Sequence, residues 1–128
     1  MRKADGGMHR TIVVLESDTA IQRKITKRAQ QAGLCSSTLT LKELYDLELP
    51  DNQAAGFFVG ITSLADAHAR AIRHICQASP DAEVVAMIND NDSQLAVGLF
   101  KMGARNVLMK PLSQAQLSKT IQDLQNGA

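Results

Sequence analysis

The sequence predicts an α/β fold in which five buried strands alternate with five helices. Short apolar runs recur along the chain, as in strands that are buried on both faces of a sheet. Between these runs, apolar residues return every three or four positions, which is typical of one face of a helix. Several of the helical segments also begin with capping patterns. Alternation of this kind, with short connections, indicates a parallel sheet that is covered by helices on both sides.

The first predicted strand, at residues 12–15, leads directly into a helix. Ser17 or Asp18 can cap the start of this helix, and Gly33 is placed to end it in a left-handed conformation. One apolar face of the helix is formed by Ile21, Ile25, Ala29 and Ala32.

The second predicted strand, at residues 34–39, is polar in its middle and is therefore expected at an edge of the sheet. Thr40 and Glu43 then form a capping box, which predicts a short helix that stops before Pro50. The residues expected to face inward from this helix are Leu41, Leu44, Tyr45 and Leu47 or Leu49.

The most apolar run, at residues 55–61, predicts the central strand. It contains Phe57, Phe58 and Val59 in succession, with a glycine on either side. In open α/β sheets, the ligand or reaction centre lies just beyond the carboxyl ends of the strands. The residue at this place is Gly60, so the central strand contributes no reactive side chain there.

The second half of the chain repeats the alternation. A box-like pattern predicts a helix from Ser63, with an apolar stripe, and residues 84–88 predict a fourth buried strand. The next helix, at residues 93–102, is apolar nearly all round and must bury more than one side. A fifth strand at residues 107–109 and a helix that begins after Ser113 complete the pattern. The apolar face of the helix from Ser63 contains Leu64, Ala71, Ile72 and Ile75. That of the helix after Ser113 contains Leu117, Ile121 and Leu124.

These elements fit the flavodoxin-like doubly wound sheet with strand order 2-1-3-4-5, because that order places the polar second strand at an edge and the most apolar strand in the centre. A chain of 128 residues is one domain by length. Residues 1–10 are polar and glycine-rich, and are expected to be a disordered tail. The domain is expected to span residues 11–126.

Composition excludes several functional classes. A net charge of +1 gives no support for bulk attraction to nucleic acid or to a membrane, and no stretch approaches the ~20 apolar residues of a membrane span. The two cysteines, Cys35 and Cys76, are expected to be free, buried thiols of a cytoplasmic protein. His9 and His74 have no partners at metal-ligand spacing, and His68 is expected to be partly buried and hydrogen-bonded rather than a titrating switch.

The segment at residues 103–111, GARNVLMKP, matches the Gly-Ala-x-x-Tyr-Leu-x-Lys-Pro pattern of one family. On this segment the chain resembles the receiver domains of bacterial two-component response regulators, over roughly residues 11–125. The aromatic residue of the family's signalling switch falls at Val107. The resemblance implies a cis peptide bond between Lys110 and Pro111.

The resemblance also implies a site for phosphoryl transfer, and this chain departs from it at most positions. In the family, an acidic pair helps to bind magnesium, an aspartate accepts the phosphoryl group, and a Thr or Ser and a lysine contact the phosphate. Here the acidic pair becomes Glu16 and Ser17, the acceptor becomes Gly60, and the Thr or Ser becomes Ile88. Lys110 is kept outright. No aspartate lies within five residues of Gly60, so a shift of alignment does not recover the acceptor.

The surviving polar residues allow several interpretations. Lys110 can bind an anion, remain solvated or loosely paired, or form an ion pair with Glu16 across the empty pocket. Glu16 and Asp18 would make only a weak divalent site, and helix capping explains Asp18 more simply. Thr62 or Ser63 could replace the acceptor only with a nearby base, and the sequence shows none. No metal and no cofactor are therefore predicted.

The predicted function is that of a degenerate pseudo-receiver: a phosphorylation-independent signalling domain that is not an enzyme. Val97, Phe100 and Val107 are the candidate interface, because the resembling family dimerises or docks through its fourth helix, fifth strand and fifth helix. The expected partner is a second copy or another protein, with an output domain in a longer chain, and with no direct contact to nucleic acid or membrane. Alternatively, Phe100 packs sideways against a neighbouring helix.

Two other functions remain as alternatives. An atypical receiver could still sense a phosphoryl donor or a small anion at the pocket around Lys110. A flavodoxin-like redox domain is disfavoured, because the acidic turn at residues 16–19 lacks the glycine- and hydroxyl-rich cradle that a flavin phosphate needs.

Overall fold

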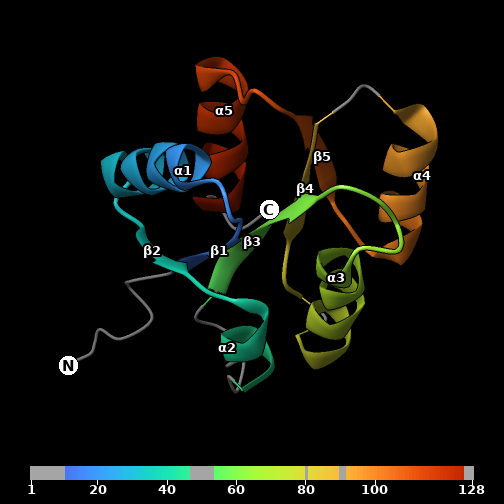
Figure 1. Ribbon diagram of the computed structural model, residues 1–128. Coiled ribbons are helices and arrows are strands. Elements are labelled where there is room, and N and C mark those ends of the chain that lie inside the picture. Colours follow the sequence, from blue (N-terminus) through green and yellow to red (C-terminus); the bar gives the residue numbers. More distant parts are fainter. Residues whose placement is uncertain (1–10, 47–53, 80, 90–91, 126–128) are drawn as a thin grey trace.

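The computed structural model describes residues 11–46, 54–79, 81–89 and 92–125, which form one five-stranded parallel sheet between two layers of helices (Figure 1). The strand order β2-β1-β3-β4-β5 confirms the predicted fold. The strands are β1 (Thr11–Leu15), β2 (Cys35–Thr38), β3 (Ala54–Ile61), β4 (Val84–Ile88) and β5 (Asn106–Met109). The helices are α1 (Thr19–Gln31), α2 (Leu41–Asp46), α3 (Ala67–Ala78), α4 (Ser93–Met102) and α5 (Gln114–Gln125). The tail predicted at residues 1–10 lies outside the described residues.

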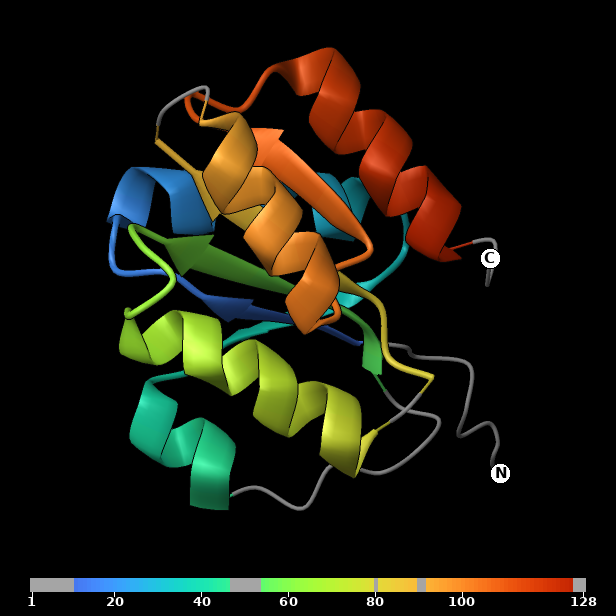
Figure 2. The same cartoon turned by 90° about the vertical axis from the view of Figure 1, so that its right-hand side faces the viewer.

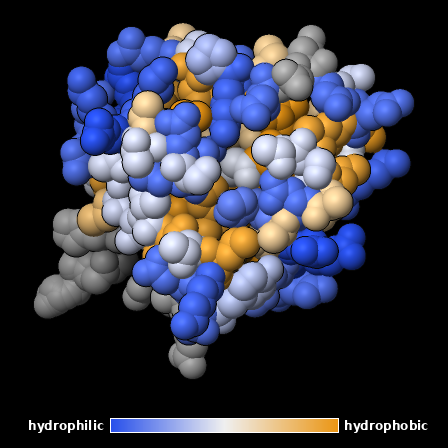
Figure 3. Space-filling view, in the orientation of Figure 1, coloured by the Kyte–Doolittle hydropathy of each residue, from blue (hydrophilic) through white to orange (hydrophobic). Residues whose placement is uncertain are grey.

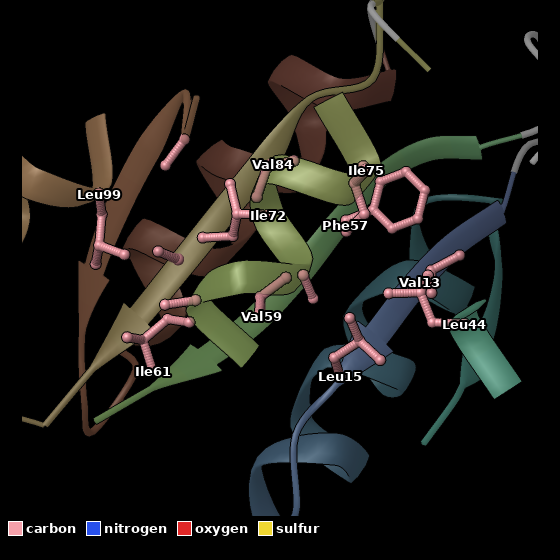
Figure 4. Packing of buried hydrophobic residues seen from close by; sticks show 14 of the residues in the cluster. Val13, Leu15, Leu44, Phe57, Val59, Ile61, Ile72, Ile75, Val84 and Leu99 are labelled. Atoms are coloured by element: carbon pink, nitrogen blue, oxygen red, sulfur yellow. The ribbon is translucent and has the colours of Figure 1, made fainter. Parts of the chain in front are cut away.

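Helices α1 and α5 cover one face of the sheet, and α2, α3 and α4 cover the other (Figures 1 and 2). Successive side chains of a strand point to opposite faces, so β3 supplies both cores: Phe57 packs beneath α2 and α3, and Phe58 packs beneath α1 and α5. Figure 4 shows the first of these cores. As predicted, the central strand is buried on both sides.

Local capping explains where the helices begin. Asp18 and Asp92 cap α1 and α4, and Thr40 and Glu43 form the predicted box at the start of α2. The prediction that α3 begins at Ser63 is wrong. Its first residue is Ala67, because the Asp66 side chain accepts a hydrogen bond from the backbone N–H of His68 and so provides the cap. Leu64, assigned to the apolar stripe of this helix, lies before it and is exposed.

Three smaller predictions need correction or lie outside the described residues. Tyr45 was expected to face inward, but it is exposed, and its ring lies 4.6 Å from the ring of His74. Cys35 is exposed, because β2 is an edge strand, whereas Cys76 is half-buried. The described part of α2 ends at Asp46, so the expectations for residues 47–50 lie outside the described residues.

Among the described helices, none is long and apolar enough to cross a membrane.

Candidate functional site

The parallel register brings most of the sequence-predicted site residues to one edge of the sheet. Leu15 pairs with Val59, so the next residues along β1 and β3, Glu16 and Gly60, lie side by side. On the other side of β3, Ile61 pairs with Ile88, and Ile88 pairs with Met109. The chain then turns at Lys110, whose backbone N–H donates to the carbonyl oxygen of Ile88 at 2.7 Å. The following peptide bond to Pro111 is cis, as the resemblance implied.

Lys110 and Glu16 form an ion pair across this edge. The Lys110 ammonium nitrogen lies 2.7 Å from Glu16 Oε1, and the two side chains are only 16% and 5% exposed. The hypothesis of an ion pair is therefore confirmed, and a solvated or loosely paired Lys110 is the wrong interpretation. Ser17, which takes the second acidic position of the family, is exposed.

Residues that follow β1 fix both the carboxylate and the backbone of Glu16. The backbone N–H of Asp18 donates to Oε2 at 2.9 Å, and the side-chain amide of Gln22 donates to the Glu16 carbonyl oxygen. Oε1 makes the ionic contact with the Lys110 ammonium and accepts no hydrogen bond from the described residues. The carboxylate thus depends on Lys110 for compensation of its charge.

The Glu16 side chain occupies the space that a side chain at position 60 would need. A Cβ atom added to Gly60 would lie 2.2 Å from Glu16 Oε1 and 3.0 Å from its carboxyl carbon. Real Cβ atoms do not approach other heavy atoms this closely. The Glu16 side chain, from the neighbouring strand end, therefore fills the space in which a side chain at position 60 would lie.

The residues at this edge do not fit a divalent metal. Among the described residues, the carboxylate that lies against Gly60 is that of Glu16, which is paired with Lys110, and Asp18 accepts from the backbone N–H groups of Ala20 and Ile21 as the cap of α1. In the described ranges, no three His, Cys, Asp or Glu side chains are grouped so that they could hold a metal ion. Divalent cations such as Mg²⁺ and Ca²⁺ are bound through several oxygen ligands, which this edge does not offer.

The substitute acceptor considered at Thr62 has a carboxylate neighbour that sequence reasoning missed. The Thr62 hydroxyl donates to Asp66 Oδ2 at 2.7 Å, and the Thr62 backbone N–H donates to the same atom at 3.1 Å. Burial alone would raise the pKa of Asp66, but these bonds, the N–H of His68 and the nearby His68 ring together lower it. A lowered pKa makes a carboxylate a weaker base, so these contacts favour a capping role for Asp66 at the start of α3 over activation of Thr62 as a nucleophile.

The candidate interface residues lie on α4 and β5, and a fourth residue joins them. Val97 and Phe100 are 51% and 48% exposed, so about half of each residue is open to solvent, which favours an interface over sideways packing of Phe100 against a neighbouring helix. Val107 is half-buried against the core beneath α4. Met109 lies two residues further along β5, on the same face of the sheet, and is 45% exposed. We name Val97, Phe100, Val107 and Met109 the α4–β5 patch; Figure 3 shows apolar side chains over α4 at the right of the molecule.

The missed residue, Met109, could have been found from the sequence. The period of two in a strand places Met109 on the same face as Val107. A methionine at this position is taken for a core residue if a helix is assumed to cover that face of the strand. Met109 lies in the edge strand β5 and is left exposed by the described residues.

Comparison with known proteins rests on three-dimensional structure. No protein-family model matches the sequence, and no curated protein sequence matches it significantly. The structure superposes on a response regulator from Thermotoga maritima with a TM-score of 0.78 and 18% identity, over 91% of this chain and 97% of the other. It superposes equally well, at 19% identity, on a CheY-like protein (tadZ) from Pseudomonas aeruginosa, over 91% and 99% of the two chains.

The chain has the fold of a response-regulator receiver domain. A third structure with this receiver fold is a response regulator from Burkholderia pseudomallei with a phosphorylated aspartic acid and a calcium ion, with a TM-score of 0.71, 18% identity and coverage of 91% and 71%. At this level of identity the likeness shows a common fold. The receiver fold of this chain, with Glu16 in the space beside Gly60, is the basis for the functional proposal.

Proposed function

We propose that this chain is a phosphorylation-independent receiver-like signalling domain of a longer regulator, and that it acts through contact with other proteins. The observation that carries the proposal is the buried Glu16–Lys110 ion pair in the space beside Gly60. In this pair the charges of Glu16 and Lys110 compensate each other, so this edge of the sheet needs no phosphoryl group to balance Lys110.

Three features of this edge oppose phosphoryl chemistry. Gly60 offers no nucleophile, and a negatively charged phosphate that entered beside it would meet the carboxylate of Glu16. A phosphate that drew Lys110 away from Glu16 would leave a buried carboxylate without its compensating charge, which costs about 3–5 kcal/mol. The same cost counts against the alternative of an anion sensor around Lys110.

A phosphodonor experiment tests the chemical half of the proposal. The chain is incubated with acetyl phosphate and magnesium, and its intact mass is measured. We expect no phosphoryl adduct, because no described carboxylate beside Lys110 is free to accept the group. The Burkholderia pseudomallei response regulator, treated in parallel, is the positive control. A stoichiometric adduct on this chain would overturn the proposal.

The α4–β5 patch is the proposed contact surface. Its exposed members are large apolar side chains on adjacent elements, which soluble monomers seldom gather without a binding role. A domain without a phosphorylation switch has no evident means of hiding and exposing this patch. We therefore propose that the contact is permanent, and that its first candidate is a homodimer through α4, β5 and α5.

Charge introduced into this patch should dissociate the dimer. We expect Phe100→Lys to lower the solution mass, measured by light scattering, from two chains to one, because a buried interface cannot accept an unpaired ammonium group. Tyr45→Lys, at an equally exposed aromatic residue on α2, should leave the mass unchanged. A parent protein that is already monomeric at high concentration would contradict the homodimer.

A further inference from the structure

The α1 helix is positively charged to an unusual degree for a chain with almost no net charge. It contains Arg23, Lys24, Lys27 and Arg28, and no acidic residue. Arg23 lies four positions before Lys27, and Lys24 lies four before Arg28, so each pair of like charges is adjacent on the helix surface. Repulsion at this spacing destabilises a helix, which means that helix stability does not explain the choice of residues.

These four charges are not compensated within the described structure. None of them forms an ion pair with the residues that the structure describes. Lys24 Nζ donates to the Leu112 carbonyl oxygen at 3.1 Å, and Arg28 donates to the Gln31 side chain at 2.9 Å. Both partners are neutral, so the positive potential remains. In Figure 3, the side chains over α1 at the upper left are predominantly hydrophilic.

The charged side chains line one wall of a groove. Helix α5 lies beside α1 on the same face of the sheet (Figure 1), and two hollows of about 430 and 250 Å³ adjoin at Arg28 and Gln31. The side chains that α5 contributes are mostly neutral and polar: Gln114, Ser118, Gln122 and Gln125. No acidic residue lines either hollow. We name this feature the α1–α5 groove.

The residues that line the groove favour a peptide over a bilayer or a nucleic acid as its ligand. The apolar face of α1 is buried in the core, at Ile25 and Ala29, and is not available to enter a bilayer. No aromatic side chain lines the groove, so it offers no stacking surface for nucleic-acid bases. Glutamine amides can both donate to and accept from a peptide backbone, and the row of cations is complementary to carboxylates.

We propose that the α1–α5 groove binds a short acidic peptide segment of a partner protein. A helix of 13 residues is roughly 20 Å long, which matches about six residues of extended peptide. Carboxylates of the segment pair with the α1 cations, while the amides of Gln114 and Gln122 bind its backbone; the Gln125 amide already donates to the Ala32 carbonyl oxygen. This proposal does not depend on the α4–β5 patch or on the absence of phosphorylation.

Fluorescence anisotropy with a defined probe tests the proposal. The probe is a fluorescein-labelled peptide of alternating glutamate and serine, about eight residues long, so that it spans the groove. We expect saturable binding that weakens as salt rises, and at least about a tenfold loss of affinity in Arg23→Glu/Lys27→Glu. Both side chains are exposed and make no described contact, so the fold should be kept, which circular dichroism checks.

A matched variant separates the groove from net charge. Lys42→Glu/Lys101→Glu makes the same change of charge on α2 and α4, away from the groove, and should bind the probe like the parent. The neutral variant Arg23→Gln/Lys27→Gln should lose affinity to a smaller extent. Equal losses in both charge-reversal variants, absence of saturable binding by the parent, or tighter binding of a thymidine oligonucleotide or of anionic phosphatidylglycerol vesicles than of the peptide would each overturn the proposal.

Discussion

Replacing Lys110 with methionine is expected to lower the free energy of unfolding by about 3–5 kcal/mol. The substitution leaves the Glu16 carboxylate, which is only 5% exposed, without the charge that compensates it. A buried charge that has lost its partner is far more costly than a surface charge in the same situation. Urea unfolding followed by circular dichroism measures the loss.

Two further variants make this result specific to the ion pair. Lys119→Met removes a lysine whose partner, Asp123, lies 3.3 Å away on the exposed side of α5, and should cost at most about 1 kcal/mol. Glu16→Gln/Lys110→Met removes both charges and keeps an oxygen that can accept from the Asp18 N–H, so most of the stability should return. A single Lys110→Met variant that is as stable as Lys119→Met would show that the buried pair is not important for the fold.

Gly60→Asp is expected to destabilise the domain by a similar amount, about 3–5 kcal/mol, although it restores the residue type of the resembling family. Its Cβ would lie 2.2 Å from Glu16 Oε1, so the Glu16 carboxylate must shift from the place in which it contacts Lys110. The new carboxylate would also face that of Glu16 in a site with one cation. The measurement is again the urea unfolding curve.

The same substitution should be tolerated once Glu16 is shortened. In a Glu16→Ala background the space beside position 60 is free, and the new carboxylate can approach Lys110 instead. We expect the double variant Glu16→Ala/Gly60→Asp to be more stable than either single variant. Simple additivity of the two losses would contradict the view that the two positions share one space.

Much of the fold could be predicted from local patterns. The apolar run around Phe57 and Phe58 identified a strand buried on both faces, and the polar second strand identified an edge. Both could be predicted because a strand position is apolar where its face of the sheet is covered and polar where that face is open to solvent. The start of α3 could not be predicted in the same way. Ser63 and Asp66 are both good capping residues, and the contacts of Asp66 with Thr62 decide between them.

The candidate site could be predicted in part. Residue types at the strand ends showed that the acceptor position is Gly60 and that Lys110 is kept, because parallel strands bring their carboxyl ends to one edge. The resemblance placed Phe100 in a candidate interface, and the period of two in a strand places Met109 beside Val107, but residue type alone does not show whether another element covers an apolar side chain.

By itself, the sequence determined the strand order and the absence of a carboxylate at position 60 of the central strand, because both follow from residue type and position along the chain. Only the tertiary structure decided which side chain occupies the space beside that position. Glu16 reaches Lys110 and fills the space beside Gly60 because the register of β1 against β3 sets its position and the Asp18 N–H fixes its carboxylate. Neither the register of two strands nor the direction of a side chain can be predicted from a single residue, since both depend on the packing of strands that are distant in the chain.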